Sequence, residues 1–287
     1  MAEQPRLEPR AQVDPAPFAT LSPDRVLDVV ENQGFRCDGR LLALNSYENR
    51  VYRVGIEDLP AVIAKFYRPD RWSDAAIIEE HAYAVELAAA EIPVIAPLGD
   101  AAHRTLRVDR DCRFALYPNR PGRAPELEDS EVLRWLGRFI GRIHAVGATS
   151  TFRARPALTI ERFGIDSREF VLASPYLPPE LCAAYATVSE ELVRQVQAVF
   201  DAIGRVRAIR LHGDCHPGNI LWSADGPHFV DLDDCLMGPA IQDLWMLISG
   251  DRDEMSAHLS AILAGYEDFF EFNLTELALI EALRTLR

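Results

Sequence analysis

The segment LHGDCHPGNIL, residues 211–221, decides how the rest of the chain is interpreted. It gathers a Gly-Asp pair, a cysteine, two histidines and an asparagine between apolar residues. Two interpretations are open: the histidines and the cysteine bind a metal ion, or the segment is a catalytic loop that works through Asp214 and Asn219. A zinc site would need a fourth ligand of suitable geometry, and the sequence nominates none.

The spacing of three polar residues favours the catalytic loop. Asn219 lies five residues after Asp214, and Asp231 lies twelve residues after Asn219. In phosphoryl transfer one carboxylate accepts the proton of the attacking hydroxyl, while an Asn oxygen and a second carboxylate hold Mg²⁺ on the nucleotide phosphates. Between Asn219 and Asp231 the sequence predicts a β-hairpin, ILW, a turn at Ala224-Asp225-Gly226, then FVD, which returns Asp231 to the loop.

Lys65 is the only lysine among the 30 Lys and Arg residues of the chain. It interrupts the apolar pattern AVIAKFY, residues 61–67, where a charge is otherwise out of place. We interpret it as the lysine that contacts the nucleotide phosphates. On the helix predicted after Ser73, Glu80 interrupts an apolar stripe and is the favoured partner of Lys65, with Glu79 as the alternative.

The chain changes character at Pro118. Before it we predict a small antiparallel sheet with one inserted helix, and after it a mainly helical region. The predicted strands are residues 41–45, 50–54, 61–67 and a pair within 108–118; the longer helices are 22–34, 73–91, 131–147 and 178–204. The predicted parts are a disordered tail (1–20), a nucleotide-binding lobe (21–117), a hinge or linker rich in proline (118–126) and a helical lobe with the catalytic loop (127–287).

The segment LTELALIEALRTLR, with Thr275 as its expected N-cap, reaches Arg287 without a Gly, Pro or capping signal. We therefore expect the natural chain to continue beyond this point.

Composition narrows the function classes. The formal net charge of −14 excludes the broad basic surface on which non-specific nucleic-acid binding depends. The five cysteines are an odd number without CxxC spacing, which argues against a disulfide framework or a zinc ribbon. No signal peptide and no apolar run of membrane-spanning length are found. We expect a cytoplasmic monomer that binds neither nucleic acid nor membrane.

Longer stretches of the chain resemble a known family. HGDCHPGN with FVDLDD is similar to the motif of the aminoglycoside phosphotransferase superfamily, which shares the protein-kinase fold. The segments LNSYENRVY, KFYRPDRW, EEH, LHGDCHPGNILW and VDLDD followed by GPAIQDLWML resemble the bacterial stress response kinase A family, over residues 20–287. The resemblance implies an α+β, bilobal, protein-kinase-like fold. It also implies a serine/threonine protein kinase of the cytoplasm that acts in stress response and protects against programmed cell death.

The same resemblance implies roles for individual residues. Asp214 would be the proton acceptor, and Asn219 and Asp231 the Mg²⁺ ligands. Ser46 would lie over the ATP, and Asp243 would be the buried carboxylate that anchors the catalytic loop. The cofactors are then ATP and Mg²⁺, and the acceptor is a Ser/Thr hydroxyl of a protein or a small hydroxyl compound.

Two departures from protein kinases leave the acceptor open. The nucleotide loop reads NSYEN instead of GxGxxG, and Leu232-Asp233 follows Asp231 where Phe-Gly is expected. Both also fit a small-molecule phosphotransferase acting on an aminoglycoside or alcohol. A metal-dependent phosphohydrolase and a pseudokinase scaffold are the remaining alternatives. The first would use His212, Asp214, His216 and Asp231. In the kinase interpretation His212 packs under the loop, while Cys215 and His216 form local structure or part of the acceptor surface.

Overall fold

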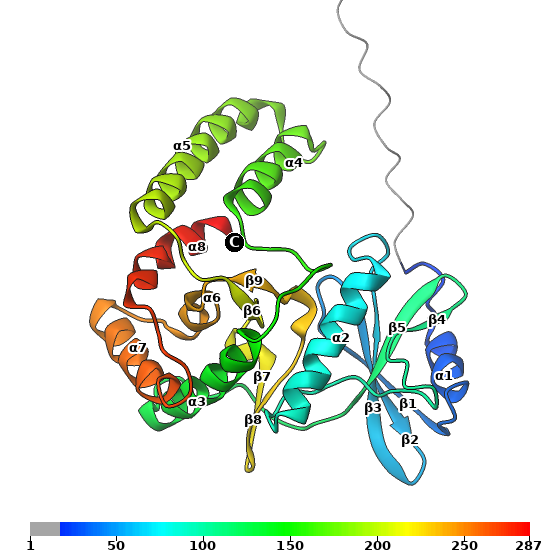
Figure 1. Ribbon diagram of the computed structural model, residues 1–287. Helices are drawn as coiled ribbons and strands as arrows, with labels where there is room; N and C mark the ends of the chain where they lie inside the picture. The colour runs from blue at the N-terminus through cyan, green and yellow to red at the C-terminus, as the bar shows by residue number, and fades with distance from the viewer. Residues whose placement is uncertain (1–17) are drawn as a thin grey trace, which may run out of the picture. The chain divides into compact units, whose positions relative to one another are not determined.

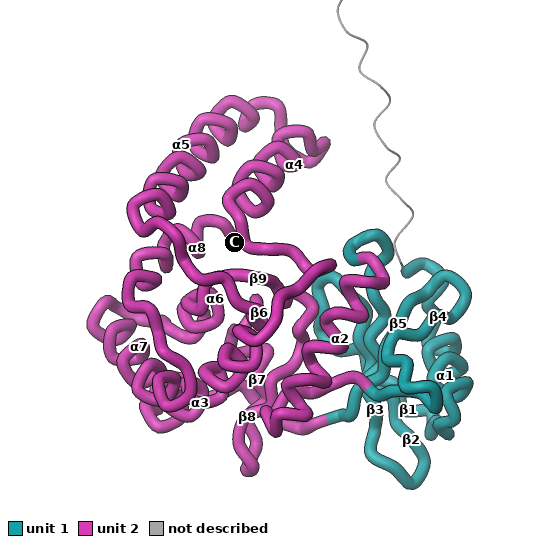
Figure 2. The backbone as a smooth tube through the Cα atoms, in the orientation of Figure 1, with its two compact units in different colours: residues 1–72, 98–119 teal, residues 73–97, 120–287 magenta. Residues whose placement is uncertain are grey.

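The computed structural model describes residues 18–287, which form two compact units (Figure 2). The first unit holds the described residues up to Trp72 together with Leu98–Asn119, and the second holds Ser73–Pro97 and Arg120–Arg287. Of the tail predicted for residues 1–20, residues 1–17 lie outside the described part. Residues 18–20 form a turn, in which the Leu21 N–H donates to the Phe18 carbonyl at 3.0 Å.

The first unit is an antiparallel sheet covered by one helix (Figure 1). The five strands are ordered β1-β2-β3-β5-β4. Their bounds are β1 (Cys37–Leu44), β2 (Arg50–Ile56), β3 (Leu59–Phe66), β4 (Arg107–Asp109) and β5 (Cys112–Pro118). Helix α1 (Pro23–Glu31) begins after Ser22, whose hydroxyl accepts the Arg25 N–H at 3.2 Å, as the Ser-Pro signal predicted.

The side chains of β3 point alternately to the buried core and to the opposite face of the sheet. Val62, Ala64 and Phe66 are buried in the core that α1 covers. Since successive side chains of a strand point to opposite faces, Lys65 lies on the other face. In register it pairs with Val51 on β2 and Ala115 on β5.

The second unit is mainly helical, with two short two-stranded sheets (Figure 1). Its α-helices are α2 (Asp74–Ala89), α3 (Ser130–Gly147), α4 (Ser167–Ala173), α5 (Pro179–Ile203), α6 (Ile241–Leu244), α7 (Arg252–Tyr266) and α8 (Ile280–Leu286). The strand pairs are β6 (Ile209–Leu211) with β9 (Leu236–Gly238), and β7 (Ile220–Ser223) with β8 (Gly226–Phe229). Helices α3 and α7 pack closely against each other, and residues of both belong to the core of this unit.

Helix α2 differs from its predicted place. Its predicted start is confirmed, because the Ser73 hydroxyl accepts the Ala76 N–H at 3.2 Å. The lobe boundaries predicted at 117/118 and 126/127, however, assign it to the first unit. In the structure its buried residues Tyr83, Ala84 and Leu87 join the core of the second unit.

Two other segments also depart from the expected local structure. The segment predicted as a hinge, 118–126, is partly fixed to β7. Arg123 in this segment and Trp222 of β7 exchange two backbone hydrogen bonds of 3.0 and 2.7 Å. The last helical segment is capped by Asn273, not by Thr275. The Asn273 side chain accepts the Thr275 N–H at 3.1 Å, and a 3-10 turn precedes α8.

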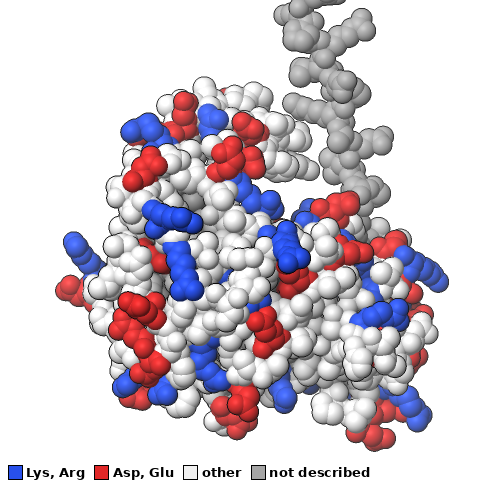
Figure 3. Space-filling view, viewed as in Figure 1, with Lys and Arg blue, Asp and Glu red and all other residues white. Residues whose placement is uncertain are grey.

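Acidic and basic side chains are interspersed over the face drawn in Figure 3, and no single basic field dominates it. This agrees with the net charge of −14. Among residues 18–287, no helix combines the length and the low polarity needed to cross a membrane.

Candidate active site

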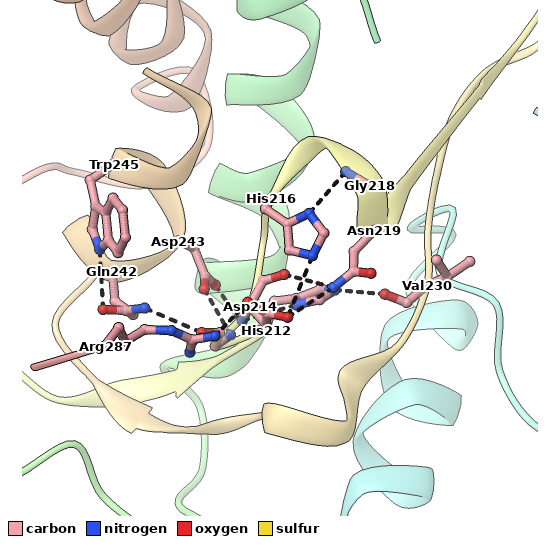
Figure 4. A network of polar contacts seen from close by, with 11 residues as sticks. His212, Asp214, His216, Gly218, Asn219, Val230, Gln242, Asp243, Trp245 and Arg287 are labelled. Carbon is pink, nitrogen blue, oxygen red and sulfur yellow. Dashed lines mark hydrogen bonds and ion pairs between the residues drawn. The ribbon is translucent and has the colours of Figure 1, made fainter. Parts of the chain in front are cut away.

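Residues 211–221, the segment LHGDCHPGNIL, form the loop that joins β6 to β7 (Figure 4). Gly213 has a φ of +85°, which a residue with a side chain adopts only with strain. The Asn219 amide nitrogen donates to the Asp214 backbone carbonyl at 2.9 Å and to its Oδ2 at 3.2 Å. The spacing of five residues thus places the Asp214 and Asn219 side chains next to each other. The Asp214 side chain is 23% exposed and can be reached from solvent.

The Asp243 side chain of α6 anchors this loop through hydrogen bonds to its backbone. Its carboxylate accepts the backbone N–H groups of His212 and Gly213, each at 2.8 Å. His144 of α3 contacts the same carboxylate through Nε2 at 3.0 Å, and the Tyr266 hydroxyl lies 2.8 Å from its Nδ1. Burial opposes ionisation of Asp243, yet its interactions with His144, His212 and Gly213 outweigh burial and lower its pKa. The geometry matches the anchoring role that the resemblance implied.

The histidines and the cysteine of the loop serve its local structure. His212 Nε2 donates to the Val230 carbonyl at 2.9 Å. His216 Nδ1 accepts the Gly218 N–H at 3.0 Å. Cys215 is fully buried, and burial raises the pKa of its thiol well above the usual value. Within residues 18–287 no group of three or more His, Cys, Asp or Glu residues could hold a metal ion, so the soft-metal interpretation has no support.

The predicted hairpin returns the chain to the loop. Strands β7 and β8 pair from Ile220–Phe229 to Ser223–Gly226, and the Val230 N–H donates to the Asn219 carbonyl at 3.0 Å. Asp231 follows directly, is exposed and has left-handed backbone angles, φ 61° and ψ 66°. A non-glycine residue in this region is strained, a feature found most often at functional sites.

The chain after Asp231 is not an extended strand. Leu232–Asp234 form a 3-10 turn, so Asp233 does not share a strand face with Asp231. Asp233 is buried, with 4% of its surface exposed. A Cβ on Gly213 would lie 2.1 Å from the Asp234 carbonyl oxygen, so only glycine lets this turn approach the catalytic loop so closely.

The two glutamates of α2 have different surroundings. The Glu79 carboxylate accepts three consecutive backbone N–H groups, those of residues 153–155, at 2.7 to 2.8 Å. Glu80 is buried, with 3% of its surface exposed. Helix α2 packs against the 3-10 turn Leu232–Asp234 that follows Asp231. The Glu79 carboxylate is therefore engaged by hydrogen-bond donors of the second unit. The pairing of Lys65 with Glu80 stays a prediction.

Ser46 and Lys65 belong to the first unit. Ser46 lies half-buried in the loop between β1 and β2. Lys65 is 6% exposed, and its Nζ lies 5.2 Å from the centre of the Tyr67 ring. Their action on one nucleotide together with Asp214 stays a prediction from the sequence.

Three residues that hold the loop or the helix beneath it were not predicted, namely Arg287, Gln242 and Glu276. Arg287 Nη2 lies 2.5 Å from Asp214 Oδ1, and its Nη1 donates to the Gly213 carbonyl at 2.8 Å. Gln242 donates to the same carbonyl at 3.2 Å. Glu276, buried, accepts the Ile241 N–H at 3.0 Å and so holds the start of α6. No local sequence pattern marks these residues, because their partners are distant in the chain.

Comparisons with known proteins agree with this geometry. Residues 40–280 match the phosphotransferase enzyme family. Stress response kinase A of Escherichia coli O157:H7 is 43% identical over 270 residues, which are 94% of this chain and 81% of that protein. The chain belongs to the stress response kinase A family. A member from Salmonella typhimurium LT2, 41% identical with the same coverage, is called serine/threonine protein kinase RdoA.

Solved structures support the fold of this family. Amicoumacin kinase hAmiN, determined in complex with AMP-PNP, Ca²⁺ and Ami, superposes with a TM-score of 0.75. It is 19% identical, and the match covers 92% of this chain and 83% of that one. The predicted α+β, protein-kinase-like fold is therefore confirmed, and the stress response kinase A family member described here is a phosphotransferase.

Proposed function

We propose that the protein is a serine/threonine protein kinase that transfers the γ-phosphate of ATP, with Mg²⁺, to protein hydroxyls. The observation that carries the proposal is the pair Asp214 and Asn219, held side by side on a loop that Asp243 anchors. The family supports it as well, since a member that is 41% identical carries the name of a serine/threonine protein kinase.

Asp214 is the proposed proton acceptor. An aspartate in this role orients the acceptor hydroxyl for in-line attack and takes its proton as the new P–O bond forms. Asp214 remains open to solvent while Asn219 and Arg287 fix its two oxygens. This combination of a fixed geometry and an accessible carboxylate suits a group that must meet an incoming substrate.

Asn219 and Asp231 are the proposed metal ligands. The Asn219 amide nitrogen is engaged by Asp214, which turns its side-chain oxygen towards a different partner. An amide oxygen and a carboxylate are hard donors of the kind Mg²⁺ prefers beside nucleotide phosphates. When bound, the ion would supply charge neutralisation for the transferring phosphoryl group.

The other proposed nucleotide contacts are Lys65 and Ser46. A buried lysine on the polar face of β3 suits a phosphate contact, because burying its charge is costly unless a negative partner is provided. Ser46 and the backbone of its loop would cover the phosphates in place of a glycine-rich loop. Glu80 is the proposed carboxylate partner of Lys65.

In the cell, we propose a cytoplasmic monomer that acts in stress response and protects against programmed cell death, without binding nucleic acid or membrane. The second candidate is a small-molecule phosphotransferase, favoured by the likeness to amicoumacin kinase. That likeness, at 19% identity, concerns the fold alone.

The deciding experiment incubates the protein with labelled ATP, Mg²⁺ and a panel of proteins, aminoglycosides and small alcohols. We expect label on serine or threonine of protein acceptors. Turnover of a small alcohol without any protein labelling would replace the first proposal by the second.

Substitution of Asp214 tests the mechanism. Asp214→Asn should lower kcat by about 10²–10⁴-fold, the usual contribution of a general base, with nucleotide affinity retained. Asp225→Asn, in the exposed β7–β8 turn, is the matched control and should keep full activity. A phosphohydrolase would instead lose activity in His216→Ala and tolerate Lys65→Ala, whereas the kinase mechanism predicts the reverse.

A further inference from the structure

Arg155 is a buried cation next to the segment that carries Asp231. It has 5% of its surface exposed. Its Nε donates to the Cys235 carbonyl at 2.9 Å, and its Nη2 donates to the Asp233 carbonyl. The guanidinium therefore holds two backbone carbonyls of the turn that directly follows Asp231. Since an arginine charge is costly to bury, its place in this turn requires a structural or functional reason.

The backbone that carries Arg155 is itself held by α2. The Glu79 carboxylate accepts the N–H groups of Arg153, Ala154 and Arg155 at 2.7, 2.8 and 2.8 Å. Three convergent N–H donors form a cradle for one anion, and charge-assisted hydrogen bonds of this kind are the strong ones. A second attachment runs to β9, where the Met237 N–H donates to the Pro156 carbonyl at 2.9 Å.

The acceptor carbonyls lie where the metal ligand needs support. Asp231 is held in a left-handed backbone conformation, which persists only if its surroundings impose it. Before Asp231 the backbone is fixed by the Val230 hydrogen bond to Asn219. After Asp231 the Arg155 side chain donates to the Asp233 and Cys235 carbonyls of the turn. Glu80 and Asp233 are also buried, with 3% and 4% of their surfaces exposed.

We propose that Glu79 and Arg155 form a positioning relay that fixes the Asp231 segment for metal binding. In this relay Glu79 holds the 153–155 backbone, and Arg155 holds the Asp233 and Cys235 carbonyls. The proposal rests on the function proposed above, because it assigns Asp231 to the metal. It also gives Glu79 and Glu80, adjacent in sequence, separate tasks.

The test measures metal binding directly. Mn²⁺ is titrated into the full chain with the non-hydrolysable analogue AMP-PNP, and free Mn²⁺ is followed by electron paramagnetic resonance. Arg155→Met should weaken Mn²⁺ binding by about tenfold or more, the usual effect of removing a group that orients a metal ligand. Affinity for AMP-PNP without metal should stay within twofold of the wild type. Arg153→Met is the matched control, because its side chain is exposed and only its backbone N–H reaches Glu79.

Further variants separate positioning from folding. Glu79→Gln keeps the side-chain shape but removes the charge, and it should weaken Mn²⁺ binding in the same direction as Arg155→Met. Arg155→Lys, which keeps the charge without the planar fork, should restore part of the affinity. In turnover assays the Mg²⁺ concentration for half-maximal rate should rise while the KM for the protein acceptor is unchanged.

The outcomes distinguish this proposal from the one on which it rests. If the wild type shows no AMP-PNP-dependent Mn²⁺ binding, the proposed function fails. If the wild type binds Mn²⁺ and the folded Arg155→Met or Glu79→Gln variants bind it within twofold, the relay alone is overturned. Should Arg155→Met not fold, Glu79→Gln decides by the same criterion.

Discussion

The Asp243 carboxylate determines where the catalytic loop lies, although it is remote from the proposed reaction. It is fully buried and accepts the His212 and Gly213 N–H groups while contacting His144. Removing its charge leaves these donors with a weaker acceptor. Breaking a buried charged pair typically costs about 3–5 kcal/mol, and losing single hydrogen bonds to a charged group about 1.5–3 kcal/mol.

We therefore expect Asp243→Asn to lower the free energy of unfolding by about 3 kcal/mol at pH 7. The pKa of Asp243 is lowered in the folded state, so its contribution is complete above the unfolded-state pKa of about 3.9 and is lost as the pH falls through the lower folded-state pKa. The gap between wild type and variant, measured by urea unfolding, should narrow from pH 7 to about pH 3.5. A gap that is constant with pH would contradict the role of the charge.

The spacing of Asp214 and Asn219 in the sequence led us to expect that they lie side by side, while their catalytic roles stay a prediction. Asp214 and Asn219 were expected to act together, and the structure places their side chains in hydrogen-bond contact. Arg155, Glu276 and Arg287 were not nominated, since each contacts the backbone or carboxylate of a segment more than 30 residues away. Such contacts are set by tertiary packing, which has no local signature in the chain.

Among the secondary-structure elements, the crossing of helices α3 and α7 depends on two glycines of α3. A Cβ on Gly137 would lie 2.0 Å from the Ile262 carbonyl oxygen, and one on Gly141 would lie 2.6 Å from that of Tyr266. Both obstacles are backbone atoms of α7, which cannot turn aside as a flexible side chain can. The helices therefore approach closely only because these two positions have no side chain.

The effect of Gly137→Ala on stability shows whether helix propensity or helix packing dominates at this position. In an open helix the substitution would stabilise by about 1 kcal/mol. At Gly137 we expect a loss of about 1–3 kcal/mol, since overpacking of this severity must move α7. Urea unfolding measures the difference. Gly164→Ala is the control, because its Cβ would meet only side-chain ends at 3.2 to 3.5 Å, and its stability should not fall.

Elements with a clear periodic pattern were the predictable part of the fold. The Ser22 and Ser73 caps and the strands around Lys65 agree with the structure. Helix α2 was assigned to the wrong unit because the amphipathic pattern shows that a helix buries one face but not which core receives it. The 3-10 turn after Asp231 was not predicted, since the run FVDLDD contains no glycine or proline that would mark a turn.

For the whole molecule, charge and nucleotide binding set the expected behaviour in solution. The chain has a net charge of −14, and the face shown in Figure 3 mixes both signs. The proposed binding of an anionic nucleotide would therefore rely on local groups such as Lys65 and on a divalent ion. This makes the response to metal removal a test of the proposed function as a whole.

Saturating AMP-PNP with Mg²⁺ should stabilise the protein by mass action. At a concentration of 100 times Kd the gain is about 2.7 kcal/mol, or a rise in the thermal unfolding midpoint of about 5–10 °C for a chain of this size. Removing the metal with EDTA should abolish most of the rise. Asp231→Asn, lacking one proposed ligand charge, should show a reduced rise with Mg²⁺ but the same small rise with AMP-PNP alone. Asp225→Asn should respond like the wild type. If Asp231→Asn retained the full Mg²⁺-dependent rise, Asp231 would not be a metal ligand, and Asn219 would have to bind the ion with a different carboxylate.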